Sequence, residues 1–374
     1  MRAGPLSPCG PLESAFRRGI LSGLSILVIQ TAFVGDVVLS TPLFEAARTR
    51  LGANRIGAVV RPETANLLRN SPHVDDIVIY DKHGAQKGPL ELLRLARGLR
   101  GAGYDAALIP HRSLRSALLG FLAGIPVRVG FDRSAGRLGR LLLTDRVPYR
   151  SVHEVDRNLS LLASWEGDTD GIRPALYPDD EDRMRVDALM RQSDVAPSEP
   201  LCGISPGSVW ATKRWLPGRY AALIRRLARE YGYRSVLFGS SGDRPLCAEI
   251  AAESGVDPLN AAGALTLLQS AALAARCSAM VSNDTGMGHV AAAMDTPVVA
   301  LFGPTVPAFG FVPYGPGHQV VETPLDCRPC SAHGGNRCPI GTHDCMGGIT
   351  VERVIEAVAV QLGLSGKPGP SVKD

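Results

Sequence analysis

Long hydrophobic runs are missing from this sequence of 374 residues. A membrane-spanning helix needs about 18–20 consecutive apolar residues, and no stretch of the chain approaches that length. The sequence therefore excludes an integral membrane protein. With 45% hydrophobic and 20% charged residues, the composition is that of a globular chain, and its length suits two α/β domains better than one.

Cysteine is scarce outside one short segment. Four of the eight cysteines are dispersed, which is typical of a protein of the reducing cytoplasm and not of a disulfide scaffold. A small-residue cleavage pattern is also missing before Thr31, although Arg17 and Arg18 precede apolar residues. We therefore expect residues 1–22 to be a flexible extension and not a signal peptide.

A strong overall charge is absent too, since the formal net charge is +4. The balance is uneven along the chain, because residues 1–150 are much richer in Lys and Arg than in Asp and Glu. A basic first half favours an anionic partner, although many such biases are only solvated faces.

Short apolar runs alternate with helical patterns, and this alternation predicts parallel, doubly wound α/β sheets. In the first half we expect strands at 25–29, 55–60, 76–80, 105–110 and 127–131, with helices at 41–51, 90–101, 113–123 and 153–165. A second alternation starts at 201, with strands near 235–239, 279–283 and 297–302 and helices near 217–231, 243–254 and 266–276. The predicted division is an extension (1–22), a first domain (23–180), a linker (181–200), a second domain (201–348), a final helix that can return to the first domain (349–364) and a tail (365–374).

The stretch "QTAFVGDVVLSTP" (30–42) places a lone acid, Asp36, directly after a glycine at the turn that follows the first strand. Ligands of doubly wound sheets bind beyond the carboxyl ends of the strands. A carboxylate there can accept a proton from a substrate hydroxyl. The alternative is an ordinary acid in the first turn of a helix.

Two strand-end loops of the second domain suit a phosphate. In "SPGSVWATKRWLP" (205–217), small residues including Ser208 permit close approach of an anion, and Lys213 can neutralise it; the alternative is a surface lysine. In "NDTGMGHV" (283–290), Asp284, Thr285 and Gly286 begin a helix whose free amides favour an anion.

The residues of this second loop also have purely structural interpretations. Asp284 or Thr285 can simply cap the helix, and His289 can be a buried core histidine. In "VLFGSSGDRP" (236–245), Gly239 and Ser240 are candidates to hold a ribose or base. Two loops suited to binding phosphate, at 205–217 and 283–290, lie in one predicted domain, and together they predict a nucleotide ligand.

Half of the cysteines lie in "CRPCSAHGGNRCPIGTHDCM" (327–346), where Cys327, Cys330, Cys338 and Cys345 follow a C-x₂-C-x₇-C-x₆-C pattern. Four such residues on one compact loop are candidates for a structural zinc site. Reduced free thiols and disulfides remain alternatives.

Taken together, the segments "GDVVLSTP", "SPGSVWATKRWLPGRYAAL", "VLFGSSGD", "NAAGALTLLQSAALAARC" and "NDTGMGHVAAAMDTPVVALFGPT" make the chain resemble the glycosyltransferase family 9 heptosyltransferases, especially the lipopolysaccharide heptosyltransferase II type. The resemblance covers about residues 24–362. It implies a GT-B fold of two Rossmann-like doubly wound domains facing a cleft. It also implies inverting transfer of heptose from ADP-heptose to the lipopolysaccharide inner core.

By this resemblance Asp36 is the proposed general base, Lys213 contacts the diphosphate, and Asp284, Thr285, Gly286 and His289 contact the nucleotide-sugar, as does Ser208. No cofactor is required for catalysis, and any bound zinc would be structural. Arg112, Arg115 and Arg133 are candidates to meet a lipid-anchored, anionic acceptor at the cytoplasmic face of the inner membrane, and no nucleic-acid partner is expected. The alternatives are another GT-B enzyme, such as a nucleotide-sugar 2-epimerase, and a non-catalytic nucleotide- or metal-binding protein.

Overall fold

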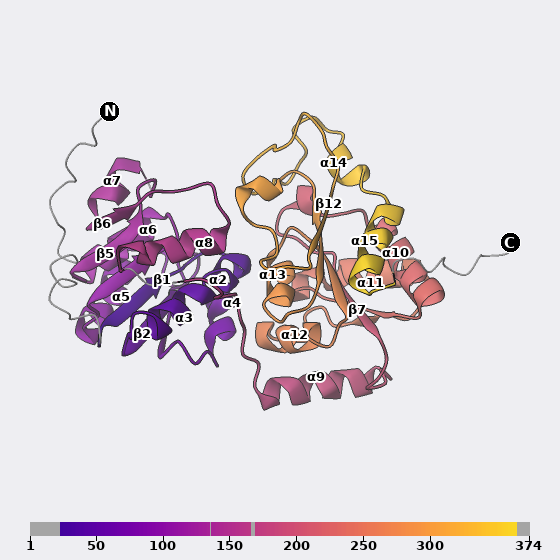
Figure 1. Cartoon of the computed structure of the whole chain (residues 1–374), viewed down its shortest axis with the longest axis horizontal. Helices are drawn as coiled ribbons and strands as arrows, with labels where there is room; N and C mark the ends of the chain where they lie inside the picture. Colours follow the sequence, from indigo (N-terminus) through magenta and orange to yellow (C-terminus); the bar gives the residue numbers. More distant parts are fainter. Residues whose placement is uncertain (1–22, 135, 166–168, 365–374) are drawn as a thin grey trace. The chain divides into compact units, whose positions relative to one another are not determined.

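The computed structural model describes residues 23–134, 136–165 and 169–364 (Figure 1). The predicted extension at 1–22 and the predicted tail at 365–374 lie outside these ranges. The chain divides into two compact units. The first runs to Arg150 and takes in Glu154–Arg173, and the second takes in Ser151–His153 and the chain from Pro174 onward.

The first unit is built on a six-stranded sheet in the order β3-β2-β1-β4-β5-β6, with every neighbouring pair parallel. Its strands are β1 (Ser25–Ile29), β2 (Arg55–Val60), β3 (Asp76–Ile79), β4 (Ala106–Ile109), β5 (Val127–Phe131) and β6 (Asp145–Val147). Its helices are α2 (Val34–Val38), α3 (Thr41–Thr49), α4 (Pro62–Ala65), η1 (Asn66–Leu68), α5 (Pro89–Ala102), α6 (Leu114–Leu122), α7 (Gly136–Leu141), α8 (Glu154–Leu159) and η2 (Ser160–Trp165).

Both faces of this sheet are covered, because β1 is buried along its whole apolar run. Leu27 and Ile29 join α5 and α6 in one hydrophobic core. Successive side chains of a strand point to opposite faces, so Ile26 and Val28, which are fully buried as well, face the other side. A strand that is apolar on both faces is what a parallel sheet between two helical layers requires.

The second unit repeats this plan, with a six-stranded parallel sheet in the order β12-β11-β10-β7-β8-β9. Its strands are β7 (Leu201–Ser205), β8 (Arg234–Leu237), β9 (Leu259–Asn260), β10 (Ala279–Asn283), β11 (Val298–Phe302) and β12 (Gln319–Glu322). Its helices are α9 (Asp180–Gln192), η3 (Ala211–Lys213), α10 (Pro217–Tyr231), η4 (Ser241–Asp243), α11 (Arg244–Ser254), α12 (Leu267–Ala274), α13 (Gly286–Ala292), η5 (Pro307–Phe309), α14 (Asp344–Gly347) and α15 (Val351–Gln361).

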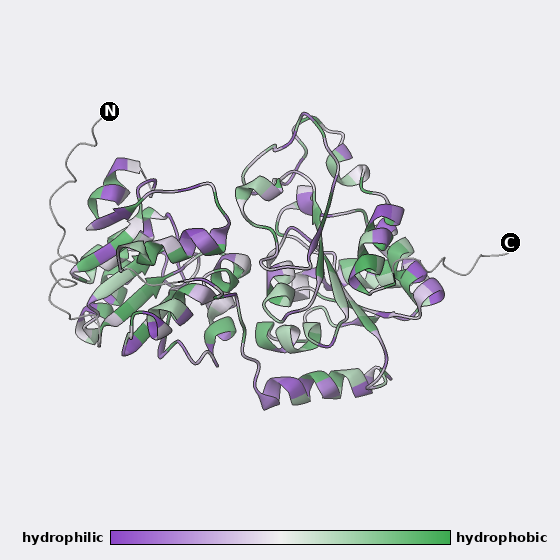
Figure 2. Cartoon of the chain, in the orientation of Figure 1, coloured by the Kyte–Doolittle hydropathy of each residue, from purple (hydrophilic) through white to green (hydrophobic). Residues whose placement is uncertain are grey.

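Two cores flank this second sheet. One combines α10, α11 and α15, and the other combines α9, α12 and α13. Figure 2 shows hydrophobic residues gathered in the strands and more hydrophilic residues along α9. The final helix α15 packs on α10 within the second unit.

The predicted doubly wound architecture is confirmed, and strands β2 and β5 span the predicted residues. The short strands β6, β9 and β12 were not predicted, because runs of two to four residues carry little periodicity. Residues 181–200, expected to link the domains, begin within α9, which packs on α12 of the second unit. The amide of Asp182 donates to the carboxylate of Asp179 at 2.9 Å and caps this helix.

In each sheet the chain order reverses beside the first strand of its unit. β1 lies between β2 and β4, and β7 lies between β10 and β8. Such a switch point leaves a crevice outside the carboxyl ends of the strands, where ligands of doubly wound folds bind. Among the helices in the described ranges, none has the length and apolar character needed to cross a membrane.

Candidate active site

Asp36 lies at the switch point of the first sheet, on the short helix α2 that follows β1. One oxygen of its carboxylate accepts a hydrogen bond from the amide of Phe33 at 3.1 Å. The side chain of Ser40 donates to the carbonyl of Asp36 at 2.6 Å and accepts a bond from Gln30 at 2.8 Å. These contacts fix the turn. Asp36 therefore does serve as a local cap. Because a carboxylate can accept several hydrogen bonds at once, this cap does not prevent it from accepting a substrate hydroxyl as well.

A half-buried lysine that the sequence analysis missed lies beside this turn. Lys82 follows β3, and its ammonium donates to the carbonyl of Thr31 at 2.6 Å. Burial lowers the pKa of Lys82, nearby arginines lower it further, and the charge of Asp36 opposes the shift. Asp36 and Lys82 thus lie close enough for their charges to interact. Its position two residues after the predicted strand at 76–80 was the available signal.

His111, in the loop after β4, lies near Lys82 and forms a polar cluster with it and Asp36. Its Nδ1 lies 3.0 Å from the hydroxyl of Thr31. Burial lowers the pKa of His111 to about 4, and the positive charges of Lys82, Arg112 and Arg61 add to this effect. The imidazole is therefore neutral near pH 7, so the charge of this group comes from its lysine and arginines.

Two of the three predicted acceptor-side arginines join this cluster. Arg115 donates to the carbonyl of Lys82 at 3.1 Å, and the guanidinium of Arg112 lies 4.2 Å from the ring centre of Tyr149. Arg133 is exposed in the turn after β5, and within the described residues no hydrogen bond or ion pair joins it to the cluster. The structure adds Arg61, whose guanidinium stacks on Phe33 at 5.5 Å.

A second carboxyl group, Glu154, lies near Asp36. It begins α8 and pairs with Arg157 of the same helix, and both side chains are buried. Burial raises the pKa of Glu154 to about 7; Arg157 opposes the shift and the charge of Asp36 adds to it. Asn158 attaches α8 to the turn by donating to the carbonyl of Leu39 at 3.2 Å. No motif in the sequence indicates this buried pair.

In the second unit, Lys213 and Asp284 form a buried ion pair at the switch point. The ammonium of Lys213 lies 2.6 Å from a carboxylate oxygen of Asp284, with side-chain exposures of 13% and 8%. The hydroxyl of Thr305 donates to the same oxygen at 2.6 Å. Lys213 is therefore not the solvated surface lysine that was the plain alternative.

Asn283, the last residue of β10, ties the two loops together. Its side-chain oxygen accepts bonds from the amide of Trp215 at 3.2 Å and from the hydroxyl of Tyr220 at 2.9 Å. Its side-chain nitrogen donates to the carbonyl of Pro206 at 2.9 Å. One buried amide thus holds the turn after β7, the segment after Lys213 and helix α10 in register.

The remaining predicted donor-side residues surround this pair. Thr285 is the residue before α13, and its hydroxyl lies 3.3 Å from that of Ser282. Gly286 begins α13, and His289 lies one turn along, only 5% exposed. Burial lowers the pKa of His289 to about 4, and its Nδ1 is buried with no hydrogen-bond partner among the described residues.

The glycine-serine loop after β8 meets the turn after β7. The carboxylate of Asp243 accepts bonds from the amide and hydroxyl of Ser240 at 2.9 and 2.7 Å. A Cβ atom on Gly239 would lie 2.7 Å from Asp243, and one on Gly207 would lie 2.5 Å from its carboxylate. Both positions therefore need glycine. Ser208 follows, and its hydroxyl accepts a bond from the amide of Trp210 at 3.3 Å.

Of the four clustered cysteines, Cys327, Cys330 and Cys338 lie in an irregular segment after β12 and Cys345 lies in α14; the seven cysteines within the described ranges are all free. Burial raises the pKa of Cys330, and the neighbouring thiols of Cys327 and Cys338 raise it further. Burial likewise raises the pKa of Cys345, and the thiols of Cys330 and Cys338 raise it further. No group of three or more His, Cys, Asp or Glu side chains in the described part of the chain is arranged to hold a metal ion.

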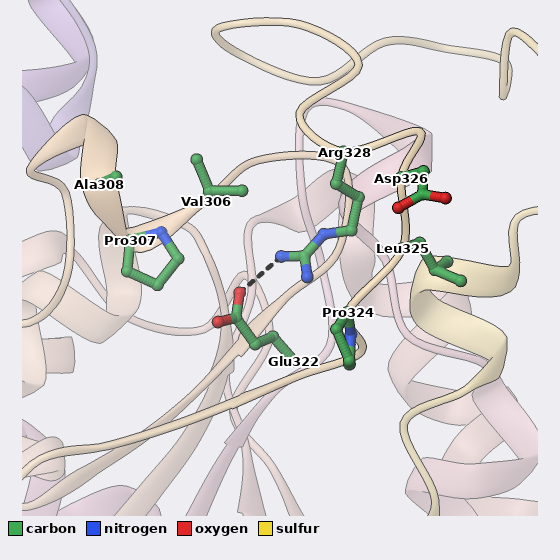
Figure 3. A pocket seen from close by; sticks show the side chains of 8 residues that line it. All are labelled: Val306, Pro307, Ala308, Glu322, Pro324, Leu325, Asp326 and Arg328. Atoms are coloured by element: carbon green, nitrogen blue, oxygen red, sulfur yellow. Dashed lines mark hydrogen bonds and ion pairs between the residues drawn. The ribbon is translucent and has the colours of Figure 1, made fainter.

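A pocket of about 560 Å³ opens beside the start of this segment (Figure 3). Arg328 reaches across it to Glu322 at 2.7 Å. The lining residues are Val306, Pro307, Ala308, Glu322, Pro324, Leu325, Asp326 and Arg328. None of the predicted site residues lines this pocket.

Two doubly wound parallel sheets, each with a polar site at its switch point, define the GT-B class of α/β protein. The family model "Glycosyltransferase family 9 (heptosyltransferase)" matches residues 92–337. The lipopolysaccharide heptosyltransferase 2 of Salmonella typhimurium is 35% identical over 298 residues, which are 76% of this chain and 84% of that relative. The enzyme of the same name from Escherichia coli is 32% identical over 302 residues, with coverage of 76% and 84%.

Solved structures agree with these sequence relatives. A family 9 glycosyl transferase from Veillonella parvula superimposes with a TM-score of 0.82 at 24% identity, over 92% of this chain and 99% of its own. The ADP-heptose lipopolysaccharide heptosyltransferase II of E. coli gives 0.73 at 28% identity, over 92% and 100%. The chain belongs to glycosyltransferase family 9, and it is a glycosyltransferase.

Proposed function

We propose that this enzyme transfers a heptose from ADP-heptose to the inner core of lipopolysaccharide, with inversion at the anomeric carbon. The names of the relatives support the donor and acceptor. The observation that carries the proposal is the placement of Asp36 after β1 and of Lys213 after β7, each at the switch point of its sheet. One site offers a proton acceptor and the other offers a cation.

Asp36 is the general base of this reaction. The acceptor hydroxyl loses its proton to the carboxylate as its oxygen attacks the anomeric carbon. The bond between that carbon and the diphosphate breaks, and ADP leaves from the opposite face. The hydrogen bond from Phe33 at 3.1 Å fixes the carboxylate on its turn, and a fixed base needs little reorganisation during the reaction.

Lys213 stabilises the leaving diphosphate. Negative charge grows on the oxygens of ADP as the bond breaks, and a positive group already in place lowers the barrier. The carboxylate of Asp284 holds the ammonium at 2.6 Å, and the hydroxyl of Thr305 donates to the same carboxylate oxygen at 2.6 Å. With this cation supplied by the chain, the transfer step needs no cofactor. Ser208, Gly239, Ser240, Thr285, Gly286 and His289 complete the donor-binding surface.

The acceptor meets the basic cluster of the first unit. Arg61, Lys82, Arg112 and Arg115 surround the turn that carries Asp36. These cations would bind an anionic group of a lipid-anchored acceptor, with Arg133 as a further contact in its exposed turn. Such an enzyme works as a peripheral protein at the cytoplasmic face of the inner membrane.

The four clustered cysteines are proposed as ligands of a structural metal ion. Thiolates are the preferred ligands of zinc and of several other metals, and such an ion would cross-link the irregular segment. Metal analysis of protein purified without chelators or a metal-affinity column should give about one equivalent per chain. A Cys338→Ser variant should lose it, and a metal-free wild-type protein would contradict the proposal.

The decisive experiment offers ADP-heptose and truncated core acceptors to the purified protein. Release of ADP together with a mass gain of one heptose on the acceptor supports the proposal. Turnover of the nucleotide-sugar without any acceptor would favour a 2-epimerase. Binding of ADP with no turnover on any core acceptor would favour a non-catalytic protein.

A further inference from the structure

The cysteine-rich segment contacts the loop that carries Lys213. The hydroxyl of Thr212 donates to the carbonyl of Gly335 at 2.8 Å and accepts from the amide of Gly335 at 2.8 Å. The amide of Thr212 also donates to the carbonyl of Gly335 at 3.0 Å. Nε2 of His343 lies 2.7 Å from the carbonyl of Thr212, where it can donate. The segment thus holds the residue next to Lys213 from both sides.

The segment also contacts the lysine side chain itself. Gly334 has a φ of +88°, and a Cβ atom there would lie 3.1 Å from Cγ of Lys213 and 3.2 Å from Cβ of Trp210. The missing side chain lets the backbone lie directly against the lysine stem. Since Lys213 is only 13% exposed, this backbone is part of what buries the lysine whose ammonium pairs with Asp284.

The start of the segment is bonded to the loop after β11, which contains Thr305. The guanidinium of Arg328 donates to the carbonyl of Thr305 at 2.8 Å and pairs with Glu322 at 2.7 Å (Figure 3). The amide of Cys330 donates to the carbonyl of Pro304 at 3.0 Å. Thr305 in turn donates its hydroxyl to Asp284 at 2.6 Å. The segment therefore lies directly against Lys213 and reaches Asp284 through Thr305.

From these contacts we propose that the Gly334–Gly335 turn and His343 are positioning elements for Lys213, which set its ammonium at the donor diphosphate. The inference rests on the proposed function of Lys213. It assigns a role in donor binding to a segment that none of the predicted donor residues occupies. Gly334, Thr212 and His343 act through the lysine and need not touch the donor.

The test measures binding of ADP to the full-length protein by calorimetry. Gly334→Ala adds a methyl group against the lysine stem and should weaken ADP binding about tenfold, while its backbone strain at a φ of +88° should lower the midpoint of thermal unfolding about as much as in the control variant Gly341→Ala. Gly341→Ala is the matched control. It lies in the same segment with a similar φ of +82°, and a Cβ atom there meets no atom within 4 Å, so ADP binding should be unchanged.

A second pair of variants tests the hydrogen bonds between the hydroxyl of Thr212 and the backbone of Gly335 without adding a larger side chain. Thr212→Val removes the hydroxyl that bonds to Gly335 and should raise the KM for the donor several-fold, with the KM for the acceptor unchanged. Thr212→Ser keeps the hydroxyl and should restore the wild-type donor KM. If the valine and serine variants have the same donor KM, the hydrogen bonds of the Thr212 hydroxyl have no role in donor binding and the inference fails.

A double-mutant cycle separates the inference from the function on which it rests. In a Lys213→Ala background, Gly334→Ala should weaken ADP binding no further, because the lysine that it displaces is absent. An equal loss in both backgrounds would overturn the inference and leave the role of Lys213 intact. Normal ADP binding by Lys213→Ala alone would overturn both.

Discussion

At the scale of single residues, Asp36 combines two roles that the sequence presented as alternatives. Its carboxylate accepts the amide of Phe33, as a helix cap does, and it lies close to the charges of Lys82 and Glu154. A cap alone needs only a hydrogen-bond acceptor, which asparagine supplies. A general base needs a carboxylate, so this substitution separates the two roles.

We predict that Asp36→Asn lowers kcat by about 10²- to 10⁴-fold, because the amide cannot take the acceptor proton. ADP release during transfer measures this, and the affinity for ADP should stay unchanged. Asp105→Asn is the control. That carboxylate also accepts a backbone amide, from Ser25 at 2.8 Å, but it precedes β4 and so lies at the amino ends of the strands, away from the switch-point crevice. An Asp36→Asn enzyme with most of its turnover would show that Asp36 is only a cap.

His289 gives a prediction about pH. Burial lowers its pKa from 6.5 to about 4; Asp284 opposes the shift, and His153, Lys213 and His318 add to it. Between these pH values the unfolded chain binds a proton that the folded chain does not. The stability contributed by the neutral ring is therefore complete above about pH 6.5 and is lost as the pH falls toward 4.

Urea denaturation of the wild-type protein and of His289→Gln at several pH values tests this. The difference between their free energies of unfolding should shrink by up to about 3 kcal/mol from pH 7 to pH 4. The comparison cancels other titrating groups, such as His111. A difference that does not change with pH would mean that His289 titrates normally in the folded protein.

Residue types at strand ends were predictable from the sequence, but their partners were not. Lys213 and Asp284 were both chosen as donor residues, yet their ion pair joins positions 71 residues apart. Lys82 was missed, because its burial depends on Thr31 and on arginines from separate loops. A sequence shows which side chains follow each strand. It does not show which strand ends are neighbours.

At the scale of elements, Asn283 joins β10 to the segment after Lys213 and to α10. We predict that Asn283→Ala lowers the free energy of unfolding by about 3 kcal/mol, because the amide of Trp215, the hydroxyl of Tyr220 and the carbonyl of Pro206 each lose a buried hydrogen bond. Tyr220→Phe removes one of these bonds and should cost about 1 kcal/mol. Denaturant titration of both variants measures the costs. Equal costs would mean that Asn283 is not the common link.

Helices were easier to predict than short strands for a physical reason. Helix α10 spans the predicted residues 217–231, because its fifteen residues hold several turns of apolar periodicity between Pro217 and a glycine. Strand β9 has two residues, and only its pairing with β8 defines it. Helix α9 was taken for a linker because its sequence is strongly acidic at the start. Those acids stabilise a helix N-terminus.

At the scale of the whole molecule, each unit has its own sheet and its own buried cores. We predict that the second unit, expressed from Pro174 to residue 364, folds cooperatively and binds ADP within about threefold of the full chain. It should transfer no heptose, because Asp36 belongs to the first unit. Calorimetry and the transfer assay measure both properties. A folded fragment that cannot bind ADP would mean that donor binding requires the first unit.

The sequence by itself determined the α/β class, most of the regular elements and the polar loops at the strand ends, because apolar periodicity and turn residues are local properties. Only the tertiary structure decided which loops meet. The order of strands in each sheet brings Lys213 to Asp284 and lays the cysteine-rich segment against Thr212. Contacts between distant residues depend on how the chain crosses from strand to strand, and local patterns do not record that path.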